Sequence, residues 1–229
     1  MLERAEIAPL LQPGVDPARL HAFSLQWSAL SLKLLEESER FLLEGSYRCQ
    51  AVREYQLGRD MLTLARGSIP RYRRLADHAR DLVEQWNERR SVQIGHTQLL
   101  TQQTPPSLLR LLQRRRSLLE SDAPWTFLAA IHEVDALLTL LGPLLLQRAE
   151  EAQLQPGVRL YTDVVAMSEA RTAEILDSFL RASPHRVDTL LAAGEDVLNN
   201  YADFLAECAI AALNLATARS HHGSSAGYK

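Results

Sequence analysis

The chain has 229 residues, of which 46% are hydrophobic and 23% are charged, so it is long and apolar enough to bury a sizeable core. Its formal net charge of −3 excludes a general electrostatic attraction to nucleic-acid backbones or anionic lipid. Cys49 and Cys208 are the two cysteines and lie far apart, which excludes a disulfide framework and a thiolate metal cluster. The N-terminal residues carry no signal-peptide pattern, so we expect a cytoplasmic protein.

Long helical patterns follow one another along the chain, separated by prolines and glycines. Asp16-Pro17 is typical of a helix start and Gly45 of a helix end, so these residues bound the first expected helix. The next expected segments are helices over about 47–66 and 68–90, followed by a polar, mobile loop near 91–106.

The rest of the chain continues in the same way. Helices are expected over about 107–121, 123–151, 160–182 and 183–219, and Pro143 is expected to kink the second of these. Residues 221–229 are expected to form a disordered tail, and no strand-like alternation persists. The sequence therefore predicts an all-α fold, a single domain over 1–220 that forms an elongated antiparallel bundle of six or seven long helices.

The pentapeptide LQPGV occurs twice, over 11–15 and 154–158, each time before a long helix. A duplicated half is one interpretation of this repeat. The helices that follow share no further pattern, so independent use of the same Pro-Gly turn chemistry is the preferred interpretation.

The most apolar stretch covers residues 124–146 and contains the polar side chains of His132, Glu133 and Asp135. Charged residues inside a lipid-spanning helix are costly. We therefore expect no membrane insertion.

Di-iron and di-manganese sites are common in helical bundles. Such sites use Glu-x-x-His on two helices, and this motif is absent from the chain. The reverse spacing, His-x-x-Asp, occurs at His78–Asp81 and His132–Asp135, and also at positions 185 and 188. These pairs favour ordinary hydrogen bonds on helix surfaces, and no cofactor is predicted; the alternative is an iron or manganese site or a proton relay.

Basic residues cluster at 71–74 and 114–116, but acidic residues follow each cluster within a turn or so. Mixed charge of this kind is typical of a solvated helix face, so no nucleic-acid partner is expected. Motifs of phosphate-binding loops, serine hydrolases and zinc proteases are absent.

Two charged side chains fall on apolar helix faces. Arg115 lies in the middle of a leucine face, with Arg116 near its edge and Arg114 opposite, and Glu54 lies within the apolar stripe of the second expected helix. Three interpretations are open for Arg115. Its guanidinium reaches water along the leucines, pairs with Glu54 in the core, or meets an anionic ligand or partner.

These observations favour a non-enzymatic interaction protein: a scaffold, adaptor or regulatory partner that binds another protein or a second copy of itself through its C-terminal helix. The motivation is the lack of catalytic motifs and the long apolar stripe of that helix. The alternative is a helical-bundle enzyme or ligand-binding protein with a His/carboxylate metal site or an internal pocket. The candidate ligand- or partner-binding residues are Arg115, Glu54 and Arg116.

Overall fold

A computed structural model describes residues 4–167 and 170–218. The structure is 85% helical, and no strand occurs within the described residues. The all-α prediction is therefore confirmed.

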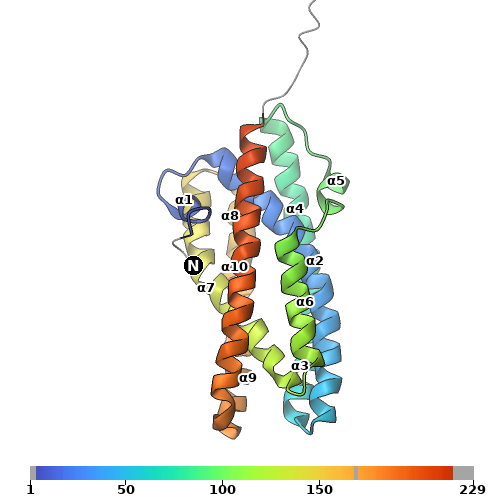
Figure 1. The fold of residues 1–229 in the computed structure, drawn as a ribbon. Helices are drawn as coiled ribbons and strands as arrows, with labels where there is room; N and C mark the ends of the chain where they lie inside the picture. Colours follow the sequence, from blue (N-terminus) through green and yellow to red (C-terminus); the bar gives the residue numbers. More distant parts are fainter. Residues whose placement is uncertain (1–3, 168–169, 219–229) are drawn as a thin grey trace, which may run out of the picture.

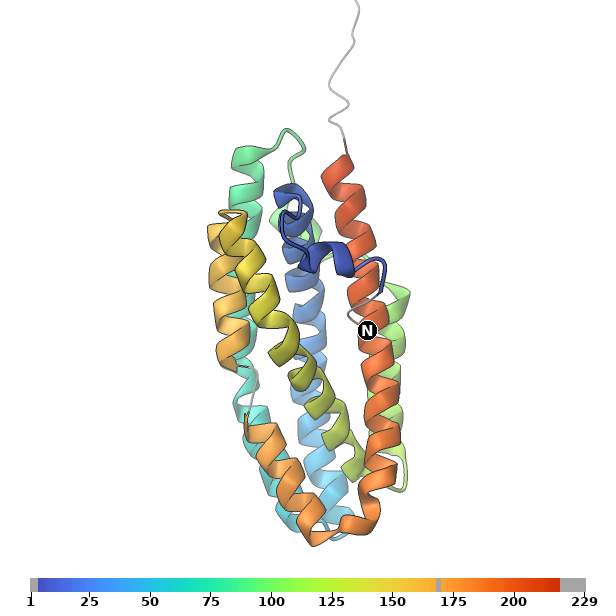
Figure 2. The ribbon, with the colours of Figure 1, turned by 90° about the vertical axis from the view of Figure 1, so that its left-hand side faces the viewer.

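Antiparallel rods form an elongated bundle (Figures 1 and 2). Two of the rods are described as two successive helices each, and the others are single helices. In chain order the rods are α2 (Pro17–Ala51), α3 (Tyr55–Arg66) with α4 (Ser68–Arg89), α6 (Pro106–Glu120), α7 (Phe127–Glu151), α8 (Gln155–Met167) with α9 (Ala170–Ala182), and α10 (Val187–Thr217). Short helices connect them: α1 (Ala8–Leu11), α5 (His96–Leu100) and the 3-10 turns η1 (Pro124–Thr126) and η2 (Pro184–Arg186).

The turns after α2 and α7 have the same geometry. Arg53 and Gln153 both have positive φ angles, 68° and 53°. In each turn the following residue donates its N–H to the carbonyl five residues back: Glu54 to Cys49 at 2.8 Å and Leu154 to Ala149 at 2.9 Å. This is the bonding pattern of a Schellman motif, which satisfies the last carbonyls of a helix.

Gly45 does not end the first helix, because α2 continues to Ala51. Gly45 instead allows other helices to approach α2 closely: a Cβ at this position would lie 2.9 Å from the Met61 sulfur. A Cβ at Gly58 would lie 2.8 Å from the Ser46 carbonyl oxygen. Both glycines therefore permit the tight α2–α3 packing. The second expected helix, α3, begins at Tyr55 rather than near residue 47.

The second half also departs from the expected boundaries. The helix expected over 160–182 is described on both sides of residues 168–169, as α8 and α9, and α8 begins earlier than expected, at Gln155, with Pro156 in its first turn where no N–H is needed. Pro143 lies inside α7, which continues through it. The two LQPGV copies occupy different structures, since 11–15 joins α1 to α2 whereas 154–158 spans the α7–α8 turn and the start of α8.

The segment expected as a mobile loop over 91–106 is partly helical and is held by side chains of α4. The Trp86 indole donates to the Val92 carbonyl at 2.8 Å. Asn87 donates to the Ile94 carbonyl and accepts from the Ile94 N–H, at 2.9 and 2.8 Å. The expected tail, 221–229, lies outside the described residues.

Several polar side chains inside the core find partners. His21 is buried, its Nε2 lies 2.8 Å from the Leu82 carbonyl oxygen, and its ring meets Trp86 edge-on at 5.3 Å. Burial lowers the pKa of His21 to about 4. The hydroxyls of Ser24 and Tyr161 lie 2.8 Å apart in the same core. These bonds offset the cost of burying polar atoms.

The helical stretch Pro124–Glu151 is long and apolar enough to cross a membrane by length and composition. Its most apolar window has a mean hydropathy of 1.5, and 44% of that window is buried inside the protein. Central helices of bundles share these properties, so the stretch alone assigns no membrane location.

Candidate functional site

A cavity of about 120 Å³ lies in the middle of the bundle. Its wall is formed by α2, α4, α6, α7, α8 and α10, so each rod contributes one helix to it. The described residues of α3 and α9 do not line it. The lining residues are Trp27, Ser31, Leu34, Leu35, Ser38, Arg71, Leu75, Arg115, Val134, Asp135, Leu138, Val164 and Tyr201.

Arg115 brings a guanidinium into this cavity. The apolar face of α6, which includes Leu111 and Leu118, turns toward the core and takes Arg115 with it, so that only 3% of the residue is exposed. Its Nη1 donates to the Ser38 hydroxyl at 2.8 Å, and that hydroxyl donates to the Leu34 carbonyl at 2.6 Å. Its Nε is buried and has no hydrogen-bond partner among the described residues.

The charge of Arg115 is not balanced by an ion pair. No carboxylate oxygen of the described residues lies within 4.0 Å of its nitrogens. Burial lowers the pKa of Arg115 to about 10, and smaller electrostatic effects of Tyr201 and Asp135 oppose this change. Arg115 is therefore a desolvated cation at neutral pH.

Two hydroxyls in the wall add hydrogen-bonding capacity. The Tyr201 oxygen accepts from the Trp27 indole N–H at 3.3 Å, so its own proton is available for donation. Burial raises the pKa of Tyr201 above its ordinary range, which keeps the phenol neutral. Ser31 is 6% exposed, and its hydroxyl has no partner among the described residues.

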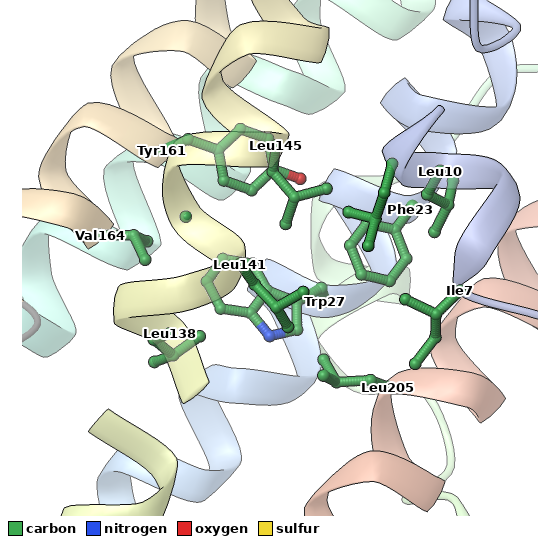
Figure 3. A pocket seen from close by; sticks show the side chains of 12 residues that line it. Ile7, Leu10, Phe23, Trp27, Leu138, Leu141, Leu145, Tyr161, Val164 and Leu205 are labelled. Carbon is green, nitrogen blue, oxygen red and sulfur yellow. The ribbon is translucent and has the colours of Figure 1, made fainter. Parts of the chain in front are cut away.

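One end of the cavity continues into an apolar layer. Trp27, Leu138 and Val164 line both the cavity and a neighbouring void of about 10 Å³. Figure 3 shows this layer, with Ile7 and Leu10 of the N-terminal segment closing it on the side of α10. The void is too small for an organic ligand, so this end acts as an apolar floor.

The other side of the cavity approaches solvent. Ser38, Arg71 and Asp135 are half-buried members of its wall. Asp135 accepts a hydrogen bond from the Thr172 hydroxyl at 3.0 Å. It also borders a groove between α7 and α9 that includes His132. A small molecule in the cavity would therefore have charged groups near its outlet and apolar groups at its floor.

The structure overturns two of the three interpretations of Arg115. Its guanidinium does not reach water, and it does not pair with Glu54, whose carboxylate lies 2.6 Å from Arg186. The Arg186 guanidinium also lies over the ring of Trp125, at 4.7 Å from its centroid. Glu54 belongs to this structural cluster at the end of the bundle. It occupies the position just before α3 and does not lie within a helix stripe.

The neighbours of Arg115 also have structural partners. Arg116 is exposed outside the cavity, with its guanidinium 6.0 Å from the centroid of the Phe41 ring. Arg114 is not simply solvated, since its Nε lies 2.5 Å from an Asp196 carboxylate oxygen. Of the candidates Arg115, Glu54 and Arg116, only Arg115 lines the cavity.

The His-x-x-Asp pairs do not form as spaced in the sequence. His78 lies 2.8 Å from Asp163, and Asp81 binds Arg159 at 2.6 Å, so both bridge α4 to α8. His132 and Asp135 border the α7–α9 groove. Within the described parts of the chain, no three His, Cys, Asp or Glu side chains gather into a possible metal site. The iron or manganese alternative stays a prediction.

Sequence reasoning missed Ser31, Ser38, Trp27 and Tyr201. A signal was present for the serines, because they lie seven residues apart on the apolar face of one helix. Tyr201 lies on the apolar stripe of the last helix and is 1% exposed, so the sequence marks it only as a core residue. Its hydroxyl becomes significant only beside Arg115, which lies on another helix.

Comparison with known proteins gives no match. No family model, curated protein or solved structure matches this chain.

Proposed function

We propose that the protein binds a small organic anion in its central cavity, with Arg115 as the anchor. The carrying observation is Arg115 itself, a residue that is only 3% exposed, whose guanidinium has no carboxylate of the described residues within 4.0 Å and whose Nε has no partner. Burying an unpaired charge costs several kcal/mol. An anion in the cavity would offset that cost.

Two other inward-facing arginines differ from Arg115, because each has a carboxylate beside it. Arg148 is as buried as Arg115 and its Nε also has no hydrogen-bond partner among the described residues, but a Glu151 carboxylate oxygen lies 2.8 Å from its Nη1, so its charge is paired. Arg186 has both Glu54 and aromatic rings around it. Arg115 is paired only with a neutral serine hydroxyl, so its surroundings suit an incoming anion better than a purely structural role.

Water alone is the simplest other occupant. A cavity of about 120 Å³ has room for about four waters at roughly 30 Å³ each. Such waters would satisfy the hydrogen bonds of Arg115 and Ser31 without neutralising the charge. Because water leaves the charge of Arg115 unbalanced, we propose that an anion replaces this water.

The proposal is of binding, and the cysteines take no part in it. Cys49 and Cys208 are buried away from the cavity wall. Burial raises the pKa of the Cys49 thiol to about 12, and raises that of Cys208 further. Both therefore remain protonated and pack as apolar side chains.

Protein–protein interaction remains a second proposal. The long apolar stripe of α10 packs inside the bundle, with Val197, Phe204 and Cys208 fully buried, so it is not itself a free surface. Ile210 and Leu213 are 49% and 43% exposed on the last turns of α10 and would be the contact for a second copy. A mass of one chain by light scattering at high protein concentration would reject self-association.

Binding is tested by isothermal titration with a panel of small organic anions, using the wild-type chain and Arg115→Met. We expect at least one anion to bind the wild type and to lose at least about tenfold in affinity in the variant, as expected for a charge-assisted contact. Arg114→Met is the matched control, because Arg114 is the adjacent arginine on the same helix and lies outside the cavity. Anions that bind both variants equally would contradict the proposed function.

A further inference from the structure

The geometry points to the ligand class: we infer that the cavity takes a monocarboxylate with one compact apolar group, such as a single aromatic ring. This inference rests on the proposed function and deepens it. It is argued from three properties of the wall, which are the free edge of the guanidinium, the balance of charge and the apolar volume.

The free edge of Arg115 matches a carboxylate. Nη1 is occupied by Ser38, whereas Nε has no partner and Nη2 makes no hydrogen bond among the described residues. Nε and Nη2 lie on one edge of the planar guanidinium, and their two N–H groups are parallel. A carboxylate accepts both at once, in the bidentate arrangement that makes Arg–carboxylate pairs strong and directional.

Further donors are present for the same group. The unpartnered Ser31 hydroxyl and the Tyr201 hydroxyl belong to the same wall. Both are neutral, so they add hydrogen bonds to a carboxylate without adding charge. Each carboxylate oxygen has two lone pairs and can accept from Arg115 and from one hydroxyl together.

The charge of the wall favours a single negative charge. Arg115 is the buried charged residue of the lining and carries one positive charge, whereas Arg71 and Asp135 lie half-buried near the outlet and have interactions of their own. A monoanion balances the charge of Arg115. A dianion leaves an excess negative charge near Asp135 in a region of low dielectric, where repulsion is strong.

The remaining wall is apolar and limits the size of the ligand. Leu34, Leu75, Val134, Leu138 and Val164 contribute side chains without polar atoms. The volume is about 120 Å³, and an engineered apolar cavity of about 150 Å³ in another protein binds benzene. The central cavity is somewhat smaller, so its apolar part holds at most one ring or a short branched chain, with the carboxylate at Arg115, whereas two fused rings are too large. Inorganic phosphate would leave the apolar wall unfilled.

The test is isothermal titration of the full chain at pH 7 with benzoate, benzamide, terephthalate, inorganic phosphate, leucine and 2-naphthoate. We expect benzoate to bind at least tenfold more tightly than each of the others. Benzamide has the shape without the charge, terephthalate has a second negative charge, leucine brings an ammonium group into a cavity that already holds the Arg115 cation, and 2-naphthoate exceeds the volume.

Two variants keep the result interpretable. Arg115→Lys retains the charge and removes the planar fork, and we expect it to weaken benzoate binding at least tenfold while its circular dichroism stays unchanged. Ser38→Ala leaves the Nε edge intact, and we expect it to weaken benzoate less than Arg115→Lys does. If Arg115→Lys fails to fold, the ranking of the six probes on the wild type decides.

The possible outcomes separate the ligand class from the proposed function. Tighter Arg115-dependent binding of terephthalate, phosphate or leucine would overturn the monocarboxylate class while keeping the cavity as an anion site. Equal binding of benzoate and benzamide would also overturn it, since charge would then be irrelevant. If no probe binds and a wider anion panel also fails, the proposed function falls with it.

Discussion

Replacing Arg115 by methionine is expected to make the ligand-free protein more stable. The pKa of Arg115 falls from 12.5 to about 10 in the folded protein, and each unit corresponds to about 1.4 kcal/mol, so the folded state holds this charge at a cost of about 3 kcal/mol. Methionine removes the charge and fills similar space with a flexible apolar chain. The lost bond to Ser38 has a charged donor and is worth about 1.5–3 kcal/mol, so a net gain of up to about 1.5 kcal/mol remains.

Urea denaturation followed by circular dichroism measures this change as a shift in midpoint at constant slope. Arg114→Met is the control on the same helix. Its ion pair with Asp196 is half-exposed, so we expect a loss of at most about 1 kcal/mol. A loss of more than about 1 kcal/mol in Arg115→Met would refute the reasoning, because Arg115 would then stabilise the fold and need no ligand to explain it.

Three further predictions concern the bundle itself. His21 has a pKa of about 4 in the folded chain against 6.5 in the unfolded chain. The contribution of neutral His21 to the free energy of unfolding should therefore be fully present above pH 6.5 and fall by up to about 3 kcal/mol towards pH 4. Urea titrations at a series of pH values measure this slope, and His21→Gln should flatten it. Arg53→Gly and Gln153→Gly, at the positive-φ turns, should each raise the free energy of unfolding by about 0.5–1 kcal/mol, and an unchanged melting temperature would contradict the assigned backbone. Glu54→Gln should cost about 1–2 kcal/mol by weakening the 2.6 Å pair with Arg186, a loss that should be absent in an Arg186→Met background.

The helical class and the rods could be predicted because long apolar stripes and Pro-Gly punctuation are local signals. Helix ends were less predictable, since the glycine expected to end the first helix lies inside it and the helix ends at a turn with no glycine. Gly45 allows close packing of Met61 inside a continuous α2, whereas the actual turn uses Arg53 with a positive φ. Nothing local marks an arginine for that conformation, and only the packing of α3 on α2 selects it.

The candidate site was predictable only in part, for a related reason. The helical wheel placed Arg115 on an apolar face, which depends on one helix alone. Its surroundings depend on Ser38 of α2, Tyr201 of α10 and Asp135 of α7, and these helices are far apart in the sequence. A pair between Glu54 and Arg115 was one of three interpretations, because both residues fall on apolar faces of expected helices. In the bundle Glu54 pairs with Arg186 instead.

The most direct test of the central claim is a crystal structure of the protein grown with benzoate. The account predicts a benzoate in the central cavity, with its carboxylate on Nε and Nη2 of Arg115 and its ring against Leu138 and Val164. Ordered water alone in that cavity, at a benzoate concentration that saturates any binding seen by titration, would contradict it.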